Sequence, residues 1–87
     1  MATQILATGS TPADSADVII AAGSTLGVSL KDAGFGCEVR VYLKDDAGAY
    51  QHISNLLNKP NESSATISTP GTYRFSRVAG TCGVFSA

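Results

Sequence analysis

The 87-residue chain has no tryptophan, only one histidine and two cysteines, and its charged residues make up just 15% of the total. Soluble globular proteins usually contain about 25% charged residues. The surface must therefore consist largely of Ser, Thr, Asn and Gly, and a surface with so little charge repels neighbouring molecules only weakly. This composition is compatible with self-association or with docking onto a larger assembly.

Long apolar segments and basic clusters are missing as well. The longest apolar run, Val18 to Ala22, has five residues, whereas a transmembrane helix needs about 20. Six Lys and Arg against seven Asp and Glu give a formal net charge of −1, and the basic residues are scattered along the chain. Since nucleic-acid binding requires concentrated positive charge, we expect neither a nucleic acid nor a membrane as a partner.

The two cysteines, Cys37 and Cys82, allow two interpretations. They could form a disulfide in an oxidising compartment, or they could be two reduced thiols in the core, where free cysteine is commonly found. The N-terminus, Met1 to Gln4, has no basic stretch leading into an apolar segment of signal-peptide length. We therefore expect the protein to stay in the compartment where it is made, and we favour reduced thiols.

Few residues offer catalytic or metal-binding chemistry. A general base needs an orienting partner and a reacting group within reach, yet His52 has no accompanying nucleophile motif such as Gly-x-Ser-x-Gly. Asp45 and Asp46 fall short of the six or more oxygen ligands that calcium takes. Cys37 and Cys82 with His52 fall short of the four ligands of a structural zinc site. We expect no enzymatic activity, no cofactor and no metal.

What the sequence does contain is a series of short strand patterns, interrupted by Gly and Pro about every 8 to 12 residues, which is typical of a sandwich or barrel. The clearest pattern runs from Cys37 to Lys44, where alternate residues, Val39 and Val41 among them, face one side. Similar patterns predict seven more strands, over Gln4 to Thr8, Asp17 to Ala21, Thr25 to Leu30, Ala49 to Asn55, Ala65 to Thr69, Thr72 to Arg77 and Gly83 to Ser86.

We therefore predict an all-β fold. The expected architecture is a small antiparallel β-sandwich or barrel of about seven or eight strands, with an immunoglobulin-like, Greek-key or jelly-roll-like topology. A single domain should span residues 1–87, and residues 1–15 are a candidate for an extended N-terminal arm.

The turn Asp45 to Gly48 predicts the pairing of the central hairpin. Its glycine can take the left-handed position of a type I turn with a G1 bulge. That register places Tyr42 opposite His52 and Val41 opposite Ile53, with Ile53 in the core. A two-residue turn would instead shift the pairing by one residue and turn His52 inward. The bulged register is the one we favour.

Two other connections carry information. Ala22 to Ser24 is short enough to predict a second hairpin between the strands on either side of it. Pro70 to Phe75 is similar to the tyrosine corner of Greek-key sandwiches. In such a corner the Tyr73 phenol would bond to the backbone upstream, and Phe75 would occupy a core position.

Five residues are candidates for a protein interface. Phe35 lies at the tip of a glycine-flanked loop, where the ring is either folded back as a lid on the core, which we favour, or offered to a partner. On the central hairpin the alternation turns five side chains outward together, those of Arg40, Tyr42, Lys44, Tyr50 and His52. Tyr and Arg are enriched at interfaces. The alternative is an ordinary solvated face. The candidate interface consists of Phe35, Arg40, Tyr42, Tyr50 and His52.

Several short segments together resemble a known group of proteins. They are Ala22-Gly23-Ser24-Thr25, Gly71-Thr72-Tyr73-Arg74, Arg77-Val78-Ala79-Gly80 and Gly83-Val84-Phe85. With these segments in this order, the chain resembles small virion proteins of tailed bacteriophages, of the capsid decoration or cement type.

This resemblance implies a structural protein that binds the outside of a phage head and clamps neighbouring capsid subunits. Its partners would be the major capsid protein and itself, as a homotrimer. It would be made in the host cytoplasm and end on the capsid exterior. The alternative is an immunoglobulin-like or carbohydrate-binding recognition module of a phage tail, a fibre or a bacterial surface. A sugar platform needs exposed aromatic rings, so the lack of Trp and the presence of only three Tyr argue against this alternative.

Overall fold

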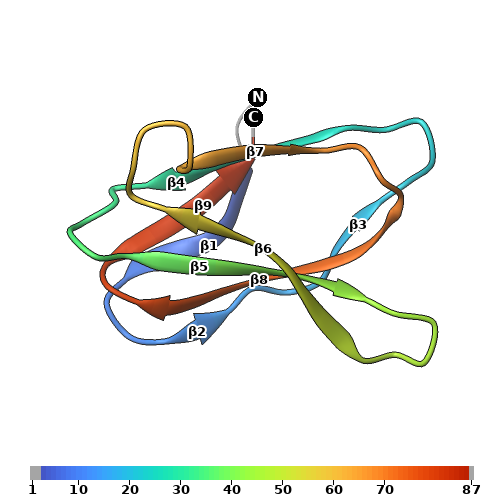
Figure 1. Cartoon of the computed structure of the whole chain (residues 1–87), viewed down its shortest axis with the longest axis horizontal. Helices are drawn as coiled ribbons and strands as arrows, with labels where there is room; N and C mark the ends of the chain where they lie inside the picture. Colours follow the sequence, from blue (N-terminus) through green and yellow to red (C-terminus); the bar gives the residue numbers. More distant parts are fainter. Residues whose placement is uncertain (1–2, 87) are drawn as a thin grey trace.

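The computed structural model of the chain describes residues 3–86, which form nine β-strands and no helix (Figure 1). Every strand pair is antiparallel. The predicted all-β class is therefore confirmed. The strands are β1 (Thr3–Gly9), β2 (Ala13–Asp14), β3 (Val18–Ile20), β4 (Leu26–Lys31), β5 (Glu38–Lys44), β6 (Tyr50–Leu57), β7 (Ser64–Ile67), β8 (Gly71–Ala79) and β9 (Cys82–Ser86).

The strands form two sheets that pack as a sandwich. The four-stranded sheet has the order β1-β9-β4-β7, and the five-stranded sheet has the order β2-β8-β5-β6, with β3 also paired to β8. Strands β6 and β7 are therefore edge strands, one in each sheet. Because the side chains of both strands line one hollow, these two edges lie on the same side of the sandwich.

The core between the sheets follows from alternation along the central strands. In β5, Val39 and Val41 are almost completely buried, as the period of two predicts. The large side chains that meet them come from β8, namely Tyr73 and Phe75, and from β9, which supplies Val84. Full burial of one such side chain is worth about 1.5 to 3 kcal/mol, so this cluster is the main source of stability.

All eight predicted strands are present, but two expectations about the N-terminal part are wrong. The described residues of the expected arm are built into the sandwich, since β1 pairs with β9 and β2 pairs with β8. Leu6 of β1 reaches the core and is only 8% exposed. The turn at Ala22 to Ser24 exists, with the Ser24 N–H donating to the Ala21 carbonyl. It does not form a hairpin, because β3 pairs in one sheet and β4 in the other.

The turn of the central hairpin has the predicted geometry. Gly48 has a φ of +87°, in the left-handed region that glycine tolerates. The Asp45 N–H donates to the Ala49 carbonyl over 2.7 Å, and the Gly48 N–H donates to the Asp45 carbonyl over 3.1 Å. Tyr42 lies opposite His52, as predicted.

One residue further along the hairpin, the predicted register is wrong. Val41 lies opposite Ser54 and not Ile53, because a β-bulge interrupts the pairing after Tyr42. The extra residue turns Ile53 out of the core, and its side chain is 50% exposed. Leu56, opposite Val39, occupies the core on this strand instead. A bulge of this kind is common on edge strands, and β6 is one.

The tyrosine corner is present as the sequence predicts. The hydroxyl of Tyr73 donates a hydrogen bond of 2.7 Å to the carbonyl of Thr69, four residues upstream. Both Tyr73 and Phe75 are buried. The segment that carries the strongest sequence resemblance therefore has an architectural role in this fold.

Candidate protein-binding surface

The outer face of the five-stranded sheet carries four of the five candidate interface residues. Tyr42 and His52 lie opposite one another, with ring centroids 5.5 Å apart, and Lys44 is opposite Tyr50. Arg40 is two residues before Tyr42 and is exposed, with its Nε 3.3 Å from a carboxylate oxygen of Glu38. The side chains that the sequence alternation predicted to share a face therefore lie on one surface of the structure.

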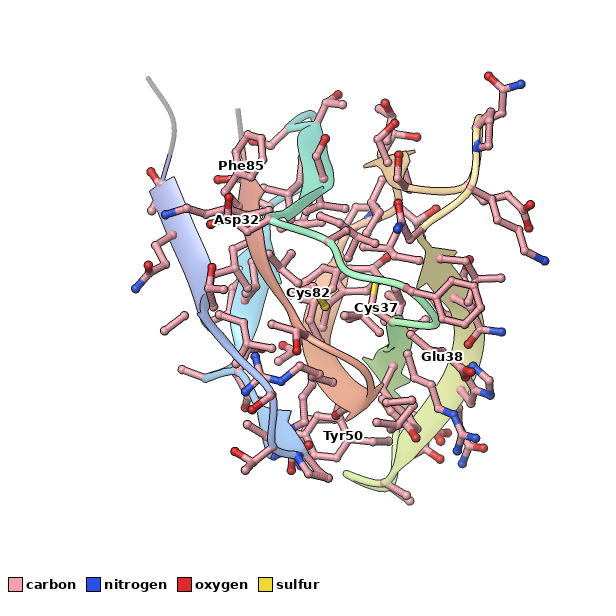
Figure 2. The ribbon with its side chains drawn as sticks, turned by 90° about the vertical axis from the view of Figure 1, so that its left-hand side faces the viewer. Asp32, Cys37, Glu38, Tyr50, Cys82 and Phe85 are labelled. Carbon is pink, nitrogen blue, oxygen red and sulfur yellow. The ribbon has the colours of Figure 1, made fainter. Side chains whose placement is uncertain are left out.

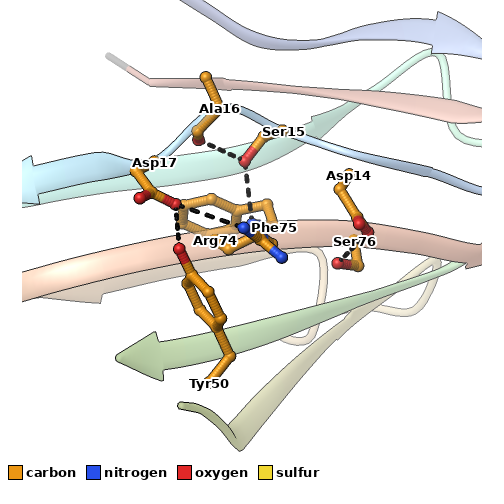
Figure 3. Close-up of polar contacts among 8 residues, drawn as sticks. All are labelled: Asp14, Ser15, Ala16, Asp17, Tyr50, Arg74, Phe75 and Ser76. Atoms are coloured by element: carbon orange, nitrogen blue, oxygen red, sulfur yellow. Dashed lines mark hydrogen bonds and ion pairs between the residues drawn. The ribbon is translucent and has the colours of Figure 1, made fainter. Parts of the chain in front are cut away.

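Tyr50 is held by two residues that sequence reasoning missed. Its hydroxyl donates a hydrogen bond of 2.6 Å to Oδ1 of Asp17, and this bond raises the pKa of Tyr50 (Figure 3). The guanidinium of Arg74 lies 3.8 Å from the centroid of the Tyr50 ring, a favourable cation–π geometry. Arg74 Nη2 is also 3.8 Å from the Asp17 carboxylate. The cluster fastens the hairpin to β8 and to the segment before β3.

A signal for Arg74 was present in the sequence. Tyr73 and Phe75 face inward, so the residue between them must face outward. Since β8 pairs with β5, Arg74 comes to lie opposite Tyr42 on the outer face. Asp17 had no comparable signal, because its approach depends on β3 pairing with β8.

The same close-up shows how β2 is fixed to β8. Ser76 Oγ donates a bond of 2.6 Å to the Asp14 carboxylate, and the Phe75 N–H donates a bond of 3.0 Å to Ser15 Oγ (Figure 3). These contacts hold the segment before β3 in place. Asp17 therefore reaches Tyr50 from a fixed position.

His52 turns its Nε2 toward its own strand. This atom is 2.6 Å from Asn55 Oδ1 and 3.0 Å from the Ser54 carbonyl. The imidazole is thus engaged locally, while the residue as a whole is exposed. Within residues 3–86, no three His, Cys, Asp or Glu side chains gather in a way that could hold a metal ion.

Phe35 is not the lid that we expected. Its side chain is fully exposed at the tip of the connection between β4 and β5. The reason lies in the backbone on either side. The Gly34 N–H donates to the Thr81 carbonyl, Asn58 donates to the Gly34 carbonyl, and Gly36 takes a φ of +72°. The loop is therefore fixed with its ring pointing into solvent.

The two cysteines are free and buried, as we favoured from the sequence. Figure 2 shows Cys37 and Cys82 next to one another in the interior of the sandwich. Burial, together with the neighbouring Cys37 thiol, raises the pKa of Cys82 to about 11. A thiol with so high a pKa stays protonated at neutral pH, so it is a poor nucleophile and acts here as a core residue.

Two exposed apolar side chains were also missed. Ile19 in β3 is 77% exposed and lies opposite Thr72, and Ile53 is exposed at the bulge. Ile19 lies within the continuous apolar run from Val18 to Ala22, where no alternation marks an exposed position, and Ile53 was expected in the core. No helix in the part of the chain that the structure describes is long and apolar enough to cross a membrane.

Comparison with known proteins finds a solved structure with the same fold. The chain matches no protein-family model and no curated protein sequence. It does match the crystal structure of the SPBc2 prophage-derived protein YomS, with a TM-score of 0.72 and 16% sequence identity. The match covers 99% of this chain and 88% of that chain. The two proteins therefore share a fold over nearly the whole length of this chain, and the neighbour is, by its description, prophage-derived.

Proposed function

We propose that this protein is a structural virion protein of a bacteriophage, and specifically that it decorates the outside of the phage head and clamps neighbouring copies of the major capsid protein. The observation that supports the phage assignment is the fold shared with a prophage-derived protein over 99% of the chain. The decoration role rests on the resemblance of segments such as Gly71 to Arg74 to decoration proteins. In this proposal the protein is made in the host cytoplasm, acts as a homotrimer on the capsid exterior and works by binding, not by catalysis.

The contact with the capsid is best supported on the outer face of the five-stranded sheet. Arg40, Tyr42 and His52 offer a cation, a phenol and an imidazole side by side on one strand pair. Tyr50 lies on the same hairpin, and its hydrogen bond to Asp17 holds the hairpin in place. The hairpin therefore need not become ordered on binding. Preorganisation of this kind lowers the entropic cost of association. Many copies on a repetitive shell would add multivalency to a weak single contact.

The location is tested by cryo-electron microscopy of particles of the phage that encodes the chain. We expect density for the protein on the outside of the head, repeated at symmetry axes of the capsid lattice. Density confined to the tail or fibres would contradict the decoration role and favour the recognition module instead.

The surface is tested by the occupancy of purified heads. A Tyr42→Ala/His52→Ala variant should bind at least about tenfold more weakly, since truncation of aromatic interface residues commonly costs more than 1 kcal/mol. Gln4→Ala is the matched control, because Gln4 is exposed on β1 in the other sheet. An equal loss for both variants would show that the hairpin face is not the contact.

A further inference from the structure

Phe35 forms an apolar projection that the chain itself leaves in water. Its side chain is 101% exposed, although burial of an aromatic ring is among the largest hydrophobic gains a single residue can make. The backbone beside it is fixed by two hydrogen bonds at Gly34, of 2.8 Å to the Thr81 carbonyl and of 3.0 Å from Asn58 Nδ2. The ring is therefore held ready for a partner and is not the tip of a loose loop.

An apolar slot lies at the open side of the sandwich, between the edge strands β6 and β7. It has a volume of about 270 Å³, and it reaches the core side chains Val41 and Tyr73. Ile53 stands at the β6 wall because of the bulge, and Ile67 stands at the β7 wall. The other lining residues are Ala, Ser and Thr, so no charged side chain borders the slot.

We propose that Phe35 of one copy of this chain inserts into the β6–β7 slot of a second copy. Phe35 does not line the slot of its own chain, so its ring and the slot remain available to other copies. A second hollow of about 420 Å³ lies beside Phe35, but Glu38 and Lys59 border it. Filling that hollow would remove charged groups from water at a cost, whereas filling the slot removes none.

The geometry of this contact determines the kind of assembly. The projection and the slot are different surfaces, so the contact is heterologous, and repeated contacts close into a ring if the rotation between copies permits. A ring of three copies would satisfy the trimer of the proposed function. The contact itself goes beyond that proposal, because it operates between copies of the chain whether or not a capsid is present.

Sedimentation velocity over a range of concentrations tests the contact. The unmodified protein should associate, and Phe35→Ser should weaken association about 10- to 100-fold, as expected for the loss of one buried aromatic ring. Ile53→Lys and Ser54→Lys, which place a cation in the slot wall, should weaken it to a similar extent. Ile19→Ser is the matched control, since Ile19 is exposed and is not among the residues that line the slot, and it should associate like the unmodified protein.

Mixing the variants identifies the partner surfaces. Phe35→Ser keeps an intact slot and Ile53→Lys keeps an intact projection, so an equimolar mixture should form heterodimers at a concentration at which each variant alone is monomeric. Heterodimer formation also shows that both variants are folded. The proposal is overturned if the unmodified protein is monomeric at all concentrations, if only one of the two surfaces matters, if Ile19→Ser is equally impaired, or if the mixture stays monomeric.

Discussion

At the scale of single residues, Arg77 is the least expected feature of the core. It is only 5% exposed, and its guanidinium donates to the carbonyls of Ala7, Thr11 and Cys82 over 2.7 to 2.9 Å. The period of two that turns Tyr73 and Phe75 inward turns Arg77 inward as well. In the sequence it is one of six scattered basic residues, and its burial is not evident there, because a buried arginine needs acceptors that only the folded chain supplies. It joins β1, the loop before β2 and β9 to β8.

Replacement of this residue should therefore be costly. We expect Arg77→Lys to lower the free energy of unfolding by about 2 to 4 kcal/mol, because an ammonium group cannot reproduce the planar fork that reaches three separate carbonyls. Urea denaturation measures the change. Arg40→Lys is the control, since Arg40 is exposed and its ion pair with Glu38 lies at the surface, and it should stay within about 0.5 kcal/mol. Equal effects for the two variants would contradict the structural role of Arg77.

At the scale of elements, features that depend on residues close together in the sequence were predicted correctly, whereas features that depend on contacts between distant strands were not. The turn at Gly48 and the corner at Tyr73 depend on residues a few positions apart, and both were predicted correctly. The bulge at Ile53 depends on β6 being a sheet edge beside β7, which no local pattern reveals. The two residues of β2 are too few for a periodic signal. The candidate interface on the hairpin was found because alternation alone brings its side chains to one face.

The hairpin turn should respond to acid through Asp45. Its carboxylate accepts hydrogen bonds of 2.9 Å from Gln51 Nε2 and from the N–H groups of Ala49 and Ala47, and these lower the pKa of Asp45 below its ordinary value of 3.8. A depressed pKa in the folded state stabilises the protein above the unfolded pKa, and this contribution is lost as the pH falls through the folded pKa. The unmodified protein should thus be more stable than Asp45→Asn at pH 7, with the difference shrinking below pH 3.8.

Urea denaturation at a series of pH values from 7 to 2 measures this difference. Gln51→Ala removes the largest cause of the shift, so its profile should fall between those of the unmodified protein and Asp45→Asn. Identical pH profiles for the unmodified protein and Asp45→Asn would show that the turn carboxylate does not contribute.

At the scale of the whole molecule, the first and last strands, β1 and β9, pair with one another at one side of the four-stranded sheet. Thr3 of β1 lies opposite Ser86 of β9, and the pairing continues to Gly9 opposite Cys82. Gly83 allows this close approach, because a Cβ there would lie 2.8 Å from the Leu6 carbonyl oxygen. The first strand is therefore a structural part of the sandwich, in contrast to the extended N-terminal arm that we expected.

Removal of this strand should unfold the protein, whereas joining it to the end of β9 in a circular permutant should not. A truncation that begins at Ser10 loses Leu6 from the core and the Ala7 carbonyl that Arg77 binds. These losses approach the total stability of about 5 to 15 kcal/mol expected of a small domain. A circular permutant with a short linker between the original ends and new ends between Asp46 and Ala47, in an exposed turn, keeps β1 beside β9. Circular dichroism and urea denaturation should show a folded permutant and an unfolded truncation, and a truncation that folds with nearly full stability would restore the idea of a dispensable arm.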